Sequence, residues 1–306
     1  MKRLYITAAV ALLALTGARG QQDPHYTQYM YNMSVFNPAY AGSKESISGG
    51  LLYRKQWVEI EDAPTTGTFF LHSPVGSNVG LGLSLINDKI GPVEETNIYG
   101  DFSYTLQLGG EHRLAFGMKA GVTMHQIDFG VITPTLPDVN DGAFGGGNPN
   151  ETFLNVGAGM FYYTDHYYLA FSVPNMLKAK YLDYDGTNYG GEELHYFLTG
   201  GYVFELSSQW KLKPFAMVKT SFGAPASIDF SLNALYAERF EIGATYRRED
   251  SFGAMASFAI TPNLRIGYAY DHIISDLKVV TPASHEVMLL FDLNLSKKVS
   301  RSPRYF

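Results

Sequence analysis

The stretch Leu114–His125 reads LAFGMKAGVTMH, and its residues alternate between two kinds throughout. One set of alternate positions is apolar: Leu114, Phe116, Met118, Ala120, Val122 and Met124. The other set is small or polar: Ala115, Gly117, Lys119, Gly121, Thr123 and His125. A period of two predicts a β-strand with two different faces. A strand that crosses a membrane at a tilt has about this length, roughly 9–11 residues.

The same alternation recurs along most of the chain and predicts fourteen strands. They span 46–57, 65–73, 79–88, 96–108, 114–127, 152–163, 167–174, 194–206, 210–219, 227–236, 240–246, 252–260, 264–272 and 284–295. An even number of strands lets a barrel close with both chain ends on the same side of a membrane.

The connections between these strands differ in length on the two sides. Every second connection is a short turn, whereas the longer ones cover 58–64, 89–95, 128–151, 175–193 and 273–283. Bacterial outer-membrane barrels have short periplasmic turns and longer outer loops. We therefore predict an all-β fold, a transmembrane antiparallel β-barrel of about 14 strands that covers residues 46–295.

The composition of the 306 residues supports a membrane barrel over other classes. Hydrophobic residues make up 46% and aromatic residues 14%, whereas only 17% are charged, compared with about 25% in a typical soluble domain. Such a chain is too hydrophobic for disorder. After the first twenty residues it has no apolar run long enough for a membrane helix, roughly 20 residues. A soluble all-β protein remains the alternative, because alternation also marks half-buried strands.

The first twenty residues have the features of an export signal. Lys2 and Arg3 precede an apolar stretch at 6–15, and Ala18-Arg19-Gly20 places small residues before a cleavage site. We predict a signal peptide over 1–20, with cleavage before Gln21, and hence an outer-membrane location. The other interpretation is an N-terminal anchor helix, for which the apolar stretch is short.

Residues 21–45 and 296–306 flank the predicted barrel without clean alternation. The first segment is rich in Tyr and Asn and contains Pro24 and Pro38. We expect it either to pack inside the barrel or under its mouth as a plug, or to be a periplasmic docking strip for a partner. The tail 296–306 either folds back to the periplasmic rim or docks to a partner.

Several motifs of the first part of the chain resemble those of the PorP/SprF family. They are Asp23-Pro24, Thr27-Gln28-Tyr29-Met30, Asn32, Asn37–Ser43, Tyr53-Arg54 and Gln56-Trp57. Similar segments at Gly82–Tyr104, Ser172–Leu177 and Ser302–Phe306 extend the resemblance over nearly the whole exported chain. The resemblance implies a non-enzymatic outer-membrane component of the type IX secretion system of Bacteroidota. Such proteins support secretion or surface attachment of cargo proteins, gliding adhesins among them.

The candidate site residues fall into two groups. The predicted plug or partner-contact residues of the N-terminal segment are Gln28, Tyr29, Asn32, Asn37, Pro38 and Tyr40. Arg54, Gln56 and Trp57 end the first predicted strand at its outer edge. These three either contact cargo or the translocon, or serve the barrel itself through lumen hydrogen bonds and an interface anchor at Trp57.

No catalytic, cofactor or metal site is expected. The chain lacks a GxSxG elbow, an HExxH motif, a Walker loop and cysteine, and the acidic stretches 138–142 and 183–186 lack calcium-loop spacing. The expected partners are outer-membrane lipids, type IX secretion components and exported cargo proteins. No Lys/Arg run indicates nucleic acid. The alternative function is a porin-like channel for small solutes. A lipid hydrolase is a weaker third hypothesis.

Overall fold

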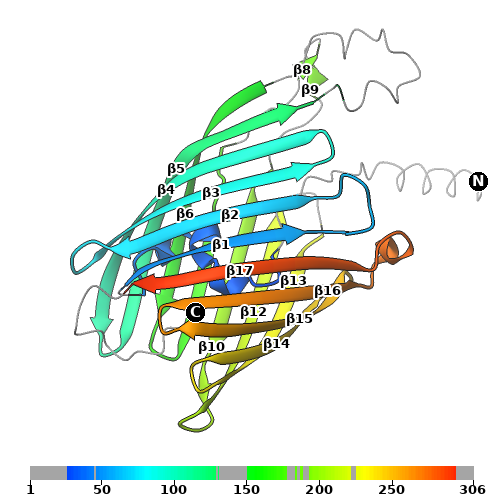
Figure 1. Cartoon of the computed structure of the whole chain (residues 1–306). Coiled ribbons are helices and arrows are strands. Elements are labelled where there is room, and N and C mark those ends of the chain that lie inside the picture. Colours follow the sequence, from blue (N-terminus) through cyan, green and yellow to red (C-terminus); the bar gives the residue numbers. More distant parts are fainter. Residues whose placement is uncertain are drawn as a thin grey trace, which may run out of the picture.

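The computed structural model describes residues 26–44, 46–128, 130, 150–177, 183–184, 187–188, 193–221 and 225–293. In this part of the chain, fourteen antiparallel strands form a closed barrel, when β10 and its short continuation β11 are taken as one (Figure 1). The strands are β1 (Ile47–Lys55), β2 (Thr65–Pro74), β3 (Val79–Ile90), β4 (Val93–Gly109), β5 (His112–Ile127), β6 (Asn150–Tyr163), β7 (Tyr167–Val173), β10 (His195–Tyr202), β11 (Phe204–Glu205), β12 (Trp210–Ser221), β13 (Ser227–Tyr236), β14 (Phe240–Arg247), β15 (Ser251–Thr261), β16 (Leu264–Ile273) and β17 (Ala283–Leu293). A separate two-residue hairpin pairs β8 (Asp183–Tyr184) with β9 (Thr187–Asn188).

The first and last strands close the barrel. β1 pairs with β2 on one side and with β17 on the other, with Leu51 opposite Leu289 in the closing pair. On the far side of the barrel, β10 pairs with both β7 and β12. Each of the fourteen strands therefore has two neighbours, and no sheet edge is left unpaired among the described residues. This confirms the predicted closed antiparallel barrel.

The two faces of the strands are the reverse of those in a soluble barrel. Large apolar side chains such as Tyr53, Phe102 and Met118 point outward and are about half exposed or more. The alternate positions carry buried polar and charged side chains, among them Lys119 and Asp271. An apolar outer surface around a polar interior is the arrangement that a hydrocarbon layer requires. The predicted membrane barrel is confirmed, and the soluble alternative is excluded.

Aromatic side chains gather on the outer surface near the short turns. The rings of Tyr167 and Tyr202 stack with centroids 6.1 Å apart, and those of Trp210 and Tyr236 lie 4.8 Å apart. Tyrosine and tryptophan favour the boundary between lipid tails and head groups, where the ring is in an apolar layer and the polar atom reaches water. This belt marks one membrane interface at the short-turn end of the barrel.

The structure differs from the prediction at two connections. The predicted loop 89–95 is wrong, because β3 continues to Ile90 and β4 begins at Val93. Asn87 donates hydrogen bonds across this hairpin to Glu94 and Thr96, each at 2.9 Å. Polar residues such as Asn87 and Glu94 occupy the outward positions of this hairpin. The apolar alternation from which the strands are predicted therefore stops before the strands themselves end.

The first strand is shorter than predicted. β1 ends at Lys55 instead of residue 57, and Trp57 adopts a left-handed backbone conformation with φ of 48°. Gln56 and Trp57 therefore belong to the loop 56–64 that leads to β2. The expected signal peptide (1–20) and tail (296–306) lie outside the described residues. No helix of the described part is long and apolar enough to cross a membrane.

The outward faces give a first testable prediction. Phe102 lies near the middle of the outward apolar run of β4, and Leu108 lies at its short-turn end. Phe102→Arg should lower the free energy of unfolding in lipid by about 2–4 kcal/mol, and Leu108→Arg by about 0–1 kcal/mol, because the cost of a cation falls towards the interface. Denaturant titration of the barrel in bilayers measures both. Equal costs at the two positions would contradict the assigned membrane position.

Candidate functional site: the segment inside the barrel

Residues 26–44 precede β1 and lie within the ring of strands (Figure 1). The segment folds into three short turns of helix: η1 (Tyr29–Tyr31), α2 (Met33–Phe36) and η2 (Pro38–Tyr40). Every residue from 26 to 41 is buried, and none of residues 26–43 carries a formal charge. The Asn37 side chain begins η2 by accepting a hydrogen bond from the Ala39 amide at 2.9 Å, and Pro38 occupies the first helical position, which needs no amide hydrogen.

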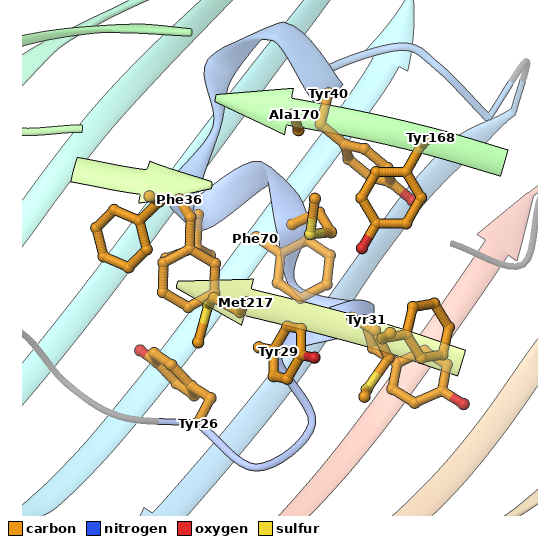
Figure 2. Packing of buried hydrophobic residues seen from close by; sticks show 14 of the residues in the cluster. Tyr26, Tyr29, Tyr31, Phe36, Tyr40, Phe70, Tyr168, Ala170 and Met217 are labelled. Atoms are coloured by element: carbon orange, nitrogen blue, oxygen red, sulfur yellow. The ribbon is translucent and has the colours of Figure 1, made fainter. Parts of the chain in front are cut away.

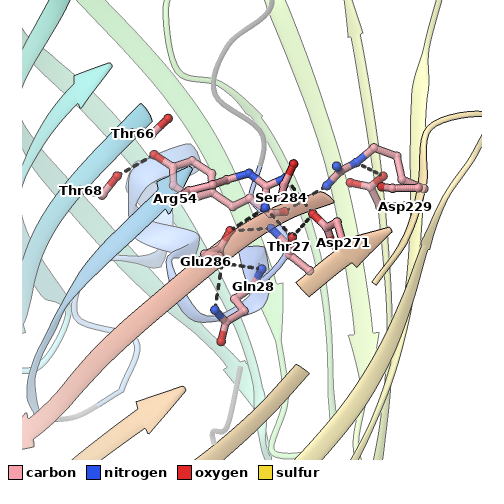
Figure 3. Close-up of polar contacts among 12 residues, drawn as sticks. Thr27, Gln28, Arg54, Thr66, Thr68, Asp229, Asp271, Ser284 and Glu286 are labelled. Carbon is pink, nitrogen blue, oxygen red and sulfur yellow. Dashed lines mark hydrogen bonds and ion pairs between the residues drawn. The ribbon is translucent and has the colours of Figure 1, made fainter. Parts of the chain in front are cut away.

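The N-terminal end of the segment is hydrogen-bonded to carboxylates of the barrel wall (Figure 3). The backbone amides of Thr27 and Gln28 each donate to Glu286 of β17 at 2.9 Å. The Thr27 hydroxyl donates to Asp271 of β16 at 2.6 Å and accepts from Arg54 of β1 at 2.7 Å. Hydrogen bonds to charged groups are stronger than neutral ones, so these contacts fix the position of residues 27 and 28.

The charged groups of this wall also pair with one another. The Arg54 guanidinium lies 2.7 Å from Asp271 and 3.2 Å from Glu286, and all three side chains are almost completely buried. Arg247 of β14 pairs with Asp229 of β13 at 2.9 Å and donates to the Tyr26 carbonyl at 3.3 Å. A buried charge is tolerated only with partners, and here the wall itself supplies them.

The C-terminal end of the segment lies against glycines of β5 and β6. A Cβ atom at Gly117 would come within 2.1 Å of the Ala39 nitrogen and 2.3 Å of the Pro38 carbonyl carbon. A Cβ at Gly159 would come within 2.0 Å of the Asn37 side chain, which donates to the Met160 carbonyl at 2.9 Å. Glycine at position 117 allows the backbone of residues 38 and 39 to approach β5 this closely, and glycine at position 159 leaves room for the Asn37 side chain.

Aromatic rings fill the space between these two ends (Figure 2). Tyr26 meets Phe36 edge to face at 5.5 Å, and Phe36 lies 5.2 Å from Phe197 of β10. Tyr40 packs edge to face against Phe161 of β6 at 5.2 Å. Such pairs favour offset or edge-to-face geometry and bury large apolar areas, so the segment forms the core of the barrel interior.

Two lysines of the wall also bind the segment. Lys119 of β5 donates to the Val35 carbonyl at 2.7 Å, and the Lys213 ammonium of β12 lies 5.4 Å from the centre of the Tyr31 ring. Burial raises the pKa of the Tyr31 phenol well above its usual value, and the nearby Glu241 carboxylate acts in the same direction. Tyr31 is therefore neutral at physiological pH and interacts with Lys213 through its ring.

The structure brings together seven of the nine predicted site residues. Gln28, Tyr29, Asn32, Asn37, Pro38 and Tyr40 are buried in the segment, and Arg54 binds it from the wall. Gln56 and Trp57 lie apart from them as half-buried residues of the loop 56–64. The backbone amide of Gln56 donates to the Pro64 carbonyl at 2.9 Å, and the backbone amide of Trp57 donates to the Ser284 hydroxyl at 3.2 Å.

The sequence did not identify the wall residues that contact the segment. Asp229, Arg247, Asp271 and Glu286 are not among the predicted site residues. The signal for them was present: each is a charged residue at an inward position of an alternating strand. Alternation places a side chain in the lumen but does not identify the strand or segment that it meets.

Two cavities lie near the two ends of the barrel. At the short-turn end, a cavity of about 480 Å³ is lined by Lys44, Arg265, Asp292 and Tyr31 among others. At the opposite end, a cavity of about 550 Å³ is lined mainly by residues 58–63, with Lys55 and Lys89. The described residues contain no group of three or more His, Asp or Glu residues that could hold a metal ion.

A closed barrel with an apolar exterior and a polar, charged interior defines a bacterial outer-membrane β-barrel. Solved barrels of this architecture resemble it. The CymD monoaromatic hydrocarbon channel matches with a TM-score of 0.52 and 13% identity, over 91% of this chain and 95% of that one. The toluene transporter TodX of P. putida matches with a TM-score of 0.50 and 10% identity, over 87% and 95%. Identities this low show the fold alone.

The family is shown by the sequence of the chain itself. Residues 18–291 match the model of the type IX secretion system membrane protein PorP/SprF family, and the chain belongs to that family. It is therefore an outer-membrane component of the type IX secretion system. The family and the barrel fold both point to a non-enzymatic protein. Among curated proteins no match is found.

The close approach at Gly117 gives a second prediction. Gly117→Val should destabilise the barrel by about 1–3 kcal/mol, because the new side chain meets the backbone of residues 38 and 39. Gly100→Val in the neighbouring strand β4 is the matched control, since a Cβ there has only one atom within 4 Å, the Ala120 carbonyl oxygen at 3.9 Å. Heat-modifiable electrophoretic mobility and denaturant titration measure the difference. A tolerated Gly117→Val would contradict the placement of residues 37–39.

Proposed function

We propose that this barrel supports the secretion or surface attachment of cargo proteins by the type IX secretion system, without catalysis. Gliding adhesins are one class of cargo that fits the family. The observation that carries the proposal is the segment 26–44, which occupies the barrel interior with its residues 26–41 buried. Together with membership of the PorP/SprF family, this favours a barrel that engages polypeptides over a free diffusion channel.

In this proposal residues 21–45 act as a plug. Hydrogen bonds at Thr27 and Gln28 hold one end of the segment, and the close contacts at Gly117 and Gly159 hold the other. The contacts reach opposite parts of the wall, from β1 and β17 to β5 and β6. A segment held on both sides of the lumen blocks passage along the barrel axis.

Contacts with other secretion components and with cargo are assigned to the two rims. At the longer-loop end, Gln56 and Trp57 are half-buried and neighbour the cavity lined by residues 58–63. At the short-turn end, the cavity beside Lys44 and Asp292 opens next to the point where β17 ends. The tail 296–306 follows there and is proposed to reach the rim.

The second candidate is a porin-like channel for small solutes. It is favoured by the fold, because one similar barrel is described as a monoaromatic hydrocarbon channel. The two candidates differ in what the lumen does. A channel needs a continuous water-filled path, whereas the proposed plug leaves none while residues 26–44 remain in place.

Deletion of the gene in its native host tests the proposed role in the cell. Surface display of proteins with a type IX sorting domain should fall severalfold, and uptake of small solutes should not change. Surface proteomics and solute-uptake assays measure the two effects. Complementation with the wild-type gene is the control for the deletion. A Trp57→Ala variant that still reaches the outer membrane tests whether Trp57 at the longer-loop rim takes part in cargo display. Normal cargo display in the deletion strain would overturn the proposal.

Single-channel recording separates the plugged barrel from the porin. The purified wild-type protein in a planar bilayer should show no large steady current, because residues 26–41 fill the lumen. Gly100→Val, whose new side chain faces away from the lumen, should behave like the wild type. Large steady currents from the wild-type protein would support the small-solute channel instead.

A further inference from the structure

We infer that the inner wall formed by β1, β13, β14, β16 and β17 is a polypeptide-binding site. Residues 26–28 of the same chain occupy it in this structure, and a separate neutral polypeptide can occupy it in their place. The inference rests on the proposed function for the identity of the natural occupant, which we assign to an exported polypeptide. The binding site itself is argued from the contacts between the wall and residues 26–28.

Three of the six hydrogen bonds between residues 26–28 and this wall are to main-chain atoms. Glu286 accepts the amide hydrogens of two consecutive residues, one on each carboxylate oxygen, and Arg247 donates to the carbonyl of the residue before them. These groups are present in every polypeptide. Half of the hydrogen bonds that hold residues 26–28 could therefore form with any polypeptide in the same position.

Two side chains of the occupant add selectivity. The Thr27 hydroxyl both donates to Asp271 and accepts from Arg54, so this position selects a hydroxyl group. The side-chain amide of Gln28 donates a hydrogen bond to Glu286 at 3.1 Å. An aspartate in place of Thr27 would set a second carboxylate against Asp271, and like charges this close repel strongly in a buried site. Acidic polypeptides are therefore excluded.

The charges of the wall remain paired when the site is empty. Arg54 keeps its contacts with Asp271 and Glu286, and Arg247 keeps its contact with Asp229. Because residues 26–43 are uncharged, their departure leaves no charged side chain alone. Removing one partner of a buried ion pair is severely destabilising, and the exchange of one neutral occupant for another avoids that cost.

The excess of carboxylates in the wall favours an occupant that donates more hydrogen bonds than it accepts. The two guanidinium groups, Arg54 and Arg247, are paired with four carboxylates, those of Asp229, Asp250, Asp271 and Glu286, so carboxylates outnumber cations around residues 26–28. Residues 26–28 make four donations to Glu286 and Asp271 and two acceptances from Arg54 and Arg247. The ligand class is therefore a neutral polypeptide segment with a hydroxyl residue.

Binding of a labelled synthetic peptide to the full-length protein in detergent tests the inference. The probe has the sequence of residues 26–36, YTQYMYNMSVF. Thr27→Val in the protein weakens the occupant and leaves every wall residue intact, so the probe should bind this variant roughly 10-fold more tightly than the wild type. Gln28→Ala is a second variant of the same kind and should also bind more tightly. Heat-modifiable mobility verifies that both variants are folded.

Control peptides define the site. A probe with Asp at the position of Thr27 should lose at least tenfold in affinity for the Thr27→Val protein, whereas a probe with Ser there should bind like the original. A photo-crosslinker on the first tyrosine of the probe should label β2 or β14, because Tyr26 contacts Thr68 and Arg247. Failure of the probe to bind either variant, equal binding of the Asp probe, or labelling of the outer surface alone would overturn the inference.

The peptide-binding experiment and the gene deletion together distinguish failure of the binding site from failure of the proposed function. Absent peptide binding with impaired cargo display in the deletion strain would reject the binding site and keep the secretion role. Peptide binding with normal cargo display would keep the site and reject the secretion role.

Discussion

Backbone amides and carbonyls inside a hydrocarbon layer have no water to bind, and this constraint determines the architecture of the protein. Each strand must have a partner on both sides, which a sheet achieves only by closing on itself. The pairing of β1 with β17, residues more than two hundred positions apart in sequence, completes that closure. Once the ring is closed, alternation along every strand separates an apolar exterior from a polar interior. The space inside must then be occupied either by protein or by water.

The interior of fourteen strands is wider than wall side chains can fill, since about eight strands already leave an interior just wide enough for them. Residues 26–44 occupy this space with rings such as Tyr26, Phe36 and Tyr40. The wall facing them is not uniform. Glycines of β5 and β6 allow the segment to approach closely, whereas β1, β16 and β17 present charged groups to it. The segment is thus held by close packing at residues 37–39 and by hydrogen bonds at residues 27 and 28.

The alternating pattern was sufficient to predict the barrel, because period-two hydrophobicity is a local property of each strand. It failed where lipid no longer contacts the outward face, as at residues 89–95, and where Trp57 turns the chain out of β1. The candidate residues of the segment were recognised from a family resemblance, but their surroundings were not predictable. Arg54 meets Asp271 and Glu286 across 217 and 232 positions of sequence, and such partners depend on the closing register of the whole barrel.

The distribution of charge within the lumen explains how polar contacts hold the segment without making the wall depend on it. If residues 26–43 carried a charge, its wall partner would be a buried ion that loses its counter-charge whenever the segment moves. Instead, Arg54 and Arg247 are neutralised by wall carboxylates, and the segment offers only dipoles. A hydrogen bond between a dipole and an ion pair is strong enough to fix Thr27 and Gln28, yet its loss leaves the pair intact. The ion pairs of the wall therefore do not depend on the occupant, whereas the packing of residues 37–40 against β5 and β6 contributes to the stability of the barrel.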